Sequence, residues 1–139
     1  MNAADVFYDT NVVLYLLSGE VAKSDRAEEL LSAGGRISVQ VLNEFAAVAS
    51  RKLGMGWPEI REILGGVRAV CPVESIAIET HERGIAVAAR YGLRIYDAMI
   101  VASALLAGCK VLYSEDLQHG QVFERQLTVR NPFQVDHPR

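Results

Sequence analysis

The stretch DVFYDTNVVLYLL, residues 5–17, joins two apolar segments through a polar triplet. The apolar residues 6–8 predict a short buried strand, and those at 12–17 predict the helix that follows it. Asp9, Thr10 and Asn11 then fall at the carboxyl end of the strand. Polar groups at such a position predict either a helix cap or a binding site.

The rest of the chain continues this alternation of strands and helices. We expect further helices over residues 22–33, with Ser24 or Asp25 near the cap, and over 41–53, 58–70, 76–91 and 97–107. We expect further strands over residues 36–39, near Val73, over 110–113 and over 127–129, the last at an edge. Such alternation predicts an α/β fold with a central, mainly parallel β-sheet and helices on both faces.

Length and composition limit the classes that remain. A chain of 139 residues that is half apolar predicts a single domain over residues 1–139, with a short tail from about 134. The net charge of −3 gives no basic surface of the kind that coats DNA. If four of the 17 acids shared one site, the remaining 13 acids would be outnumbered by the 14 Lys and Arg residues, so the rest of the molecule would be slightly basic. Two distant cysteines and the lack of a long apolar run predict a cytoplasmic protein without a membrane segment.

Four acids have positions that suit one site. Asp9 and Asp116 each follow a predicted strand directly, so both should lie at the carboxyl edge of the sheet, where ligands bind in this fold class. Asp97 at a helix start and Glu44 on a helical stripe can line the same crevice. Four carboxylates select Mg²⁺ or Mn²⁺ over zinc. They repel one another strongly unless a cation is present or some of them hold a proton. Short polar groups to orient them are Thr10, Asn11 and Ser114.

Each acid alone also has a structural explanation. Asp9 would serve as a helix N-cap, Asp97 as favourable charge in a first helical turn, Asp116 as a turn residue and Glu44 as a solvated rim residue. The order of all four along an α/β chain is what favours a shared site.

Several longer segments carry a resemblance to a known family. They are YDTNVVLYLL (8–17), SVQVLNEFAAVASRKL (38–53), YDAMIVASALLAGC (96–109), VLYSEDLQHGQVF (111–123) and NPF (131–133). With these segments the chain resembles the PIN-domain ribonucleases, and most closely the VapC-type toxins of bacterial toxin-antitoxin pairs. The likeness runs from about Val6 to Phe133.

The resemblance implies an activity and partners. It implies that Asp9, Glu44, Asp97 and Asp116 form an acidic Mg²⁺ or Mn²⁺ site, at which a metal-activated water cleaves RNA and leaves a 5′-phosphate and a 3′-hydroxyl. It also implies a small antitoxin whose tail occupies the crevice, and a homodimer whose contacts could include Leu14, Tyr15, Leu17 and Phe45. Gln118 stands where many relatives carry a further acid, so the resemblance leaves open whether one or two metal ions bind.

Basic residues close in sequence to these acids are candidate RNA contacts, although such residues commonly form a solvated face: Arg51, Lys52, Arg90 and Arg94. The histidines, at 81, 119 and 137, lack metal-ligand spacing and are expected at the surface or in the tail, with His119 close enough to Asp116 to reach substrate.

Other protein classes fit less well. A phosphotransfer receiver domain would need a Lys after the last strand, whereas Lys110 begins its strand. A haloacid-dehalogenase-type phosphatase would need an Asp where Asn11 stands. The alternative that stays open is a degenerate PIN domain that binds RNA or protein without cutting it.

Overall fold

The strand β1 (Val6–Tyr8) is buried along its whole length, as its apolar sequence predicts. The computed structural model, which describes residues 1–134, pairs β1 in parallel with β4 (Val111–Tyr113). β4 is in turn parallel to β6 (Leu127–Arg130), and β5 (Val122–Phe123) closes this edge antiparallel to β6. The order of this sheet is therefore β1-β4-β6-β5.

Two short strands extend the parallel arrangement on the other side of β1. β2 (Ile37–Ser38) pairs in parallel with β3 (Val73–Glu74), and an isolated bridge joins Phe7 of β1 to Arg36, just before β2. The Arg36 guanidinium also binds the Glu74 carboxylate at 2.6 Å. The expected mainly parallel sheet is confirmed, because β5 is the one antiparallel strand among the six that the structure describes.

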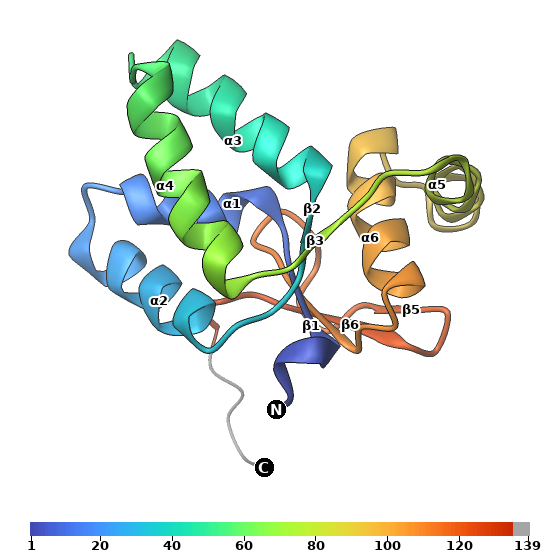
Figure 1. The fold of residues 1–139 in the computed structure, drawn as a ribbon. Coiled ribbons are helices and arrows are strands. Elements are labelled where there is room, and N and C mark those ends of the chain that lie inside the picture. The colour runs from blue at the N-terminus through green and yellow to red at the C-terminus, as the bar shows by residue number, and fades with distance from the viewer. Residues whose placement is uncertain (135–139) are drawn as a thin grey trace.

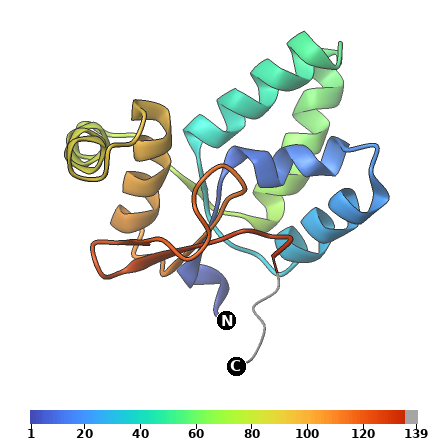
Figure 2. The same cartoon turned by 180° about the vertical axis from the view of Figure 1, so that it is seen from behind.

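The helices form two groups on either side of the strands (Figures 1 and 2). The first group packs together on one side and contains α1 (Thr10–Leu14), α2 (Val21–Ser32), α3 (Val39–Lys52) and α4 (Trp57–Val70). The second packs on the other side and contains α5 (Ile78–Tyr91) and α6 (Ile95–Leu106). Short 3₁₀ turns lie at Ala3–Asp5 and Tyr15–Leu17. Within residues 1–134, none of these helices has the length and apolarity needed to cross a bilayer.

The core lies between the strands and both helical groups. Phe7, Ile37, Phe45 and Leu112 are fully buried there, which places Phe45 in the core and removes it as a contact surface for a partner. Leu14 and Leu17 are half-buried and pack against the same core.

Several expected boundaries were wrong. α5 begins at Ile78 instead of Ile76, and α6 begins at Ile95 instead of Asp97. The helix expected over residues 12–17 is a short α-helix that continues as a 3₁₀ turn. The next helix begins earlier than expected: Glu20 is its N-cap residue and Ser24 lies inside it, because the Ser18 hydroxyl accepts from the Glu20 N–H at 3.1 Å and starts the turn there. The strand expected over residues 36–39 is shorter, since α3 begins directly at Val39.

The strand expected at the sheet edge over residues 127–129 is an inner strand, because β5 pairs along its outer side. The turn between β5 and β6 carries Glu124 and Arg125, both with positive φ, at 50° and 57°. This is the backbone of a tight type I′ hairpin, which usually requires Asn or Gly. Contacts from α5 hold it: the Glu124 N–H donates to the Tyr91 hydroxyl at 2.8 Å, and Arg83 forms an ion pair with the Glu124 carboxylate.

Candidate metal centre

Asp9 stands where β1 ends and α1 begins. Its N–H donates to the carbonyl of Tyr113 at 3.0 Å, which continues the pairing of the two central strands. Its Oδ1 accepts from the Thr10 N–H at 2.7 Å, and its Oδ2 accepts from the Ser114 hydroxyl at 2.8 Å. Asp9 is 5 % exposed. It is therefore both the N-cap of α1 and a fixed carboxylate at the carboxyl edge of the sheet.

The turn after β4 is organised by Ser114. Its Oγ accepts from the N–H groups of Asp116 and Leu117, both at 3.2 Å, so this hydroxyl ties Asp9 to the turn that presents Asp116. Asn11 reaches the same turn, since its Oδ1 accepts from the Glu115 N–H at 3.4 Å. The Asn11 Nδ2 is buried and makes no hydrogen bond within residues 1–134. An unpaired donor of this kind suits an anionic oxygen from outside the chain.

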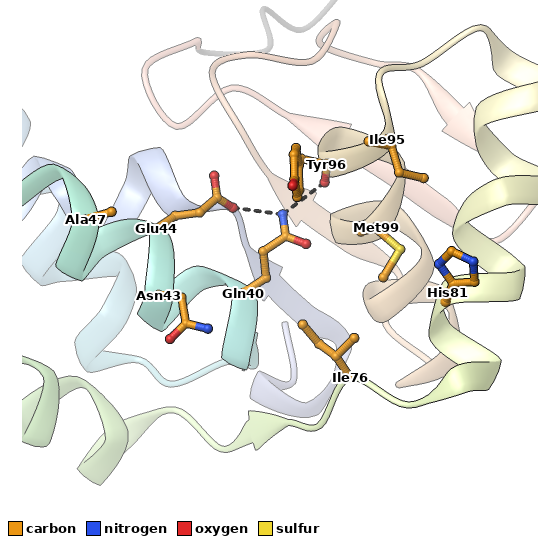
Figure 3. Close-up of a pocket in the computed structure, with 9 residues that line it drawn as sticks. All are labelled: Gln40, Asn43, Glu44, Ala47, Ile76, His81, Ile95, Tyr96 and Met99. Atoms are coloured by element: carbon orange, nitrogen blue, oxygen red, sulfur yellow. Dashed lines mark hydrogen bonds between the residues drawn. The ribbon is translucent and has the colours of Figure 1, made fainter.

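Glu44 is held by two neighbours on different helices. Its Oε1 accepts from the Thr10 hydroxyl at 3.2 Å. The same oxygen accepts from the Gln40 amide at 2.8 Å (Figure 3). The same Gln40 Nε2 donates to the backbone carbonyl of Tyr96 at 3.0 Å, so this buried amide joins α3 to the start of α6. Sequence reasoning missed both Gln40 and Tyr96. The available signal for Gln40 was its position four residues before Glu44, one helical turn away on the same face.

The four predicted acids meet in one cavity of about 140 Å³. Asp97 reaches it from the first turn of α6, as its sequence position predicts. Thr10 and Asn11 line the cavity too, whereas Ser114 acts from behind through its bonds to Asp9 and the turn. The structure therefore brings together side chains from four separate segments of the chain.

Burial and mutual repulsion act on these carboxylates. Burial raises the pKa of Asp9 to about 6, against the hydrogen bonds from Ser114 and Thr10, and the charges of Asp116 and Asp97 add to the rise. Burial also raises the pKa of Asp97, with the charges of Asp116 and Glu44 acting in the same direction. A cation in the cavity would relieve this stress, because positive charge favours the ionised form of every acid around it.

The donor set fits a hydrated divalent ion. Within residues 1–134, no three acids, histidines or cysteines converge closely enough to enclose an ion by themselves. Mg²⁺ commonly binds through one or two carboxylates, keeps several waters and takes up substrate phosphate oxygens. A cavity of about 140 Å³ has room for such a hydration sphere, since a water occupies roughly 30 Å³. Oxygen donors, without His or Cys, favour Mg²⁺ or Mn²⁺.

The candidate RNA contacts lie at different distances from this cavity. Arg94 lines an adjoining cavity together with Asp97 and Asp116. Its positive charge opposes the rise in the pKa of Asp97 that burial and the neighbouring acids cause. Arg51 and Lys52 are exposed at the end of α3 that lies away from the sheet (Figure 1). Arg90 is exposed and lies over the Tyr91 ring, 5.1 Å from its centroid.

The histidines take other places. His81 is exposed on α5. The Nδ1 of His119 accepts from the Asn131 N–H at 3.0 Å, which ties the loop after β4 to the end of β6. His137 lies outside the described residues.

Comparisons with known proteins place this geometry in a family. A sequence model of the PIN domain matches residues 6–123. A search of curated proteins gave no match. Among solved structures, a toxin-antitoxin complex from Klebsiella pneumoniae aligns with a TM-score of 0.68 at 22 % identity, covering 94 % of this chain and 99 % of that one.

Two further structures share the fold. VapC20 of Mycobacterium tuberculosis, a toxin that cleaves the sarcin-ricin loop, aligns with a TM-score of 0.62 at 20 % identity, over 78 % of this chain and 88 % of that one. VapBC2 from Rickettsia felis, bound to a DNA fragment from its promoter, aligns with a TM-score of 0.60 at 18 % identity, over 91 % and 97 %. The chain belongs to the PIN-domain family and has the fold of these toxin structures.

Proposed function

We propose that this protein is a metal-dependent endoribonuclease that acts as the toxin of a toxin-antitoxin pair. The observation that supports it most directly is the cavity in which Asp9, Glu44, Asp97 and Asp116 meet at the carboxyl edge of the sheet. The unpaired Asn11 amide beside them supplies a donor for a phosphate oxygen. Acids alone would repel RNA, so the proposal requires Mg²⁺ or Mn²⁺.

The residues divide the chemistry between them. Asp9 and Asp116 would hold the ion, which when bound would neutralise phosphate charge and lower the pKa of an attacking water. Asp97 and Glu44 orient that water and accept its proton as its oxygen attacks phosphorus. The bond from phosphorus to the 3′-oxygen breaks, the 3′-oxygen takes up a proton, and a 5′-phosphate remains. Ser114, Thr10 and Gln40 keep the carboxylates in place through the hydrogen bonds described above.

Partners and location are part of the proposal. An antitoxin is supported by the fold, which recurs in the toxin-antitoxin complexes from K. pneumoniae and R. felis. We also propose a homodimer, as the resemblance to the family implies. A cytoplasmic location is supported by Cys71 and Cys109, which are buried and unpaired, as is usual in a reducing compartment.

The deciding experiment is cleavage of a panel of tRNA, rRNA fragments and mRNA by the purified protein, with Mg²⁺, with Mn²⁺ and with EDTA. Asp116→Asn tests the site, and Asp25→Asn, an exposed acid on α2, is the matched control. We expect discrete cuts with 5′-phosphates that require the metal, disappear in Asp116→Asn and persist in Asp25→Asn.

Two results would contradict the proposal. Cleavage that persists in EDTA or in Asp116→Asn would indicate a contaminating nuclease or another mechanism. RNA binding without cleavage under any metal would favour the degenerate PIN domain, which binds without cutting.

A further inference from the structure

Tyr96 occupies an unusual position beside the carboxylates. Its ring is 70 % exposed, although it precedes the candidate ligand Asp97 directly. The residue lines the carboxylate cavity and also the two larger cavities that flank it. Its backbone is held in place, because the Tyr96 carbonyl accepts from the buried Gln40 amide at 3.0 Å. The backbone of Tyr96 is thus anchored, and its side chain is open to solvent where three cavities meet.

The first flanking cavity has the character of a small-molecule site. It measures about 600 Å³, within the usual range for ligand pockets, and lies between α3, α5 and α6 (Figure 3). Its walls are mainly apolar, with Ile76, Ile95 and Met99, and its hydrogen-bonding side chains include Asn43 and His81. Its carboxylate, Glu44, lies on the wall shared with the metal centre. Such a cavity suits a flat, neutral group with polar edges.

The second flanking cavity carries charges of both signs. It measures about 680 Å³ and is lined by Arg94, by the amides of Gln118 and Gln121, and by the acids Asp97 and Asp116 of the candidate metal centre. The RNA backbone suits this side because Arg94 is the one Arg or Lys among the residues lining the three cavities, and a guanidinium binds phosphate oxygens, while an ion held at Asp116 would offset the two acids. The two cavities therefore separate the parts of a nucleotide: backbone beside Arg94, base beside Tyr96.

We propose that Tyr96 stacks on an unpaired RNA base next to the cleaved phosphate, and that this base enters the cavity between α3, α5 and α6. The inference rests on the proposed ribonuclease function and assigns Tyr96 and the adjoining cavity a role in positioning the substrate. A paired base cannot enter, since duplex stacking holds it, whereas splayed bases stack readily on aromatic side chains. Asn43 and His81 then face the edge of the base and bias which base is accepted.

The test combines an abasic substrate series with variants of Tyr96. Short RNAs carry one abasic nucleotide at successive positions around a cut site, and single-turnover cleavage is measured in Mg²⁺. We expect one position at which the abasic nucleotide slows the wild type about 5- to 150-fold. Tyr96→Ala should lose a similar factor and no longer respond to the abasic position, while Tyr96→Phe keeps the response. Trp57→Ala, which removes a 66 % exposed ring from α4, is the matched control and should behave as wild type.

A second measurement separates this inference from the cleavage proposal. In an Asp116→Asn background, short single-stranded RNAs carrying 2-aminopurine at successive positions should show fluorescence quenching on binding at one of them, lost when Tyr96 is also changed to Ala. If no RNA is cut but this quenching occurs, the nuclease proposal fails and the stacking site stands.

Three results would overturn the stacking site. They are an unchanged abasic penalty in Tyr96→Ala, equal cleavage of the same sequence in a duplex, and absence of quenching at every position. A change of molecular mass in Tyr96→Ala by light scattering, with the abasic penalty intact, would assign the cavity to a protein contact instead.

Discussion

Replacing Asp9 by Asn should make the metal-free protein more stable at neutral pH while removing its activity. Burial and the neighbouring acids raise the pKa of Asp9 from 3.8 to about 6, a shift of roughly two units. At about 1.4 kcal/mol per unit, the ionised side chain costs the fold about 3 kcal/mol. Asn removes that charge, and its amide retains an acceptor for the Thr10 N–H and a polar group facing Ser114.

The sign of the effect follows from the raised pKa. Below about pH 4 Asp9 is protonated in both the folded and the unfolded protein, so its ionisation costs nothing there. Between about pH 4 and pH 6 the unfolded chain has lost this proton while the folded protein still holds it, so the wild type loses stability relative to Asp9→Asn, and the difference levels off above about pH 6. The free-energy difference between the two proteins should therefore shift by about 3 kcal/mol in favour of the variant between pH 4 and pH 8.

Urea unfolding in EDTA across this pH range measures that difference. Asp25→Asn, which removes an exposed carboxylate of the same type, controls for general charge effects. Adding Mg²⁺ at about a hundred times its dissociation constant should stabilise the wild type by about 2.7 kcal/mol and the variant by less. The reasoning would be refuted by a free-energy difference between the two proteins that does not change with pH, or by a variant that is less stable than the wild type at pH 8. Either result would make Asp9 a structural cap.

Three other substitutions test separate parts of the structure. Gln40→Ala should weaken activity about tenfold and raise the Mg²⁺ concentration required, because Glu44 loses the hydrogen bond that orients it; a metal titration of the cleavage rate measures both effects. Gly35→Ala should destabilise the protein by about 2–4 kcal/mol in urea unfolding, since φ is 150° there and a Cβ would overlap the Tyr8 ring. Arg125→Gly should stabilise it by about 0.5–1 kcal/mol, seen as a higher Tm, because the left-handed backbone at φ 57° then carries no Cβ.

The strands could be predicted because buried parallel strands consist of short runs of apolar residues. Residues 6–8 and 110–113 are such runs, and the structure places both in the sheet centre. β5 could not be predicted, because its turn adopts positive φ at Glu124 and Arg125, where the sequence has neither Gly nor Asn. Its conformation is enforced by Tyr91 and Arg83, whose contacts with Glu124 exist only after α5 has packed.

The acids of the site could be predicted for a related reason. Asp9 and Asp116 follow strands whose ends must meet, so topology alone brings them together. Gln40 and Tyr96 could not be found in this way. It is common for a glutamine to lie one turn before an acid and for a tyrosine to lie at a helix start. Their role here depends on how α3 and α6 pack, because that packing brings the Gln40 amide to the Tyr96 carbonyl.

The pairing of β1 with β4 has a consequence for synthesis of the protein. The hydrogen bond between Asp9 and Ser114 joins residues 105 positions apart, so the two halves of the site are made at very different times. At translation rates of about 5–20 residues per second, the ribosome needs about 5–20 s to add the intervening chain. Until then the nascent polypeptide carries Asp9 without its partners. If the carboxylates cut RNA as proposed, the enzyme is inert beside its own messenger until residues 114–116 have been made.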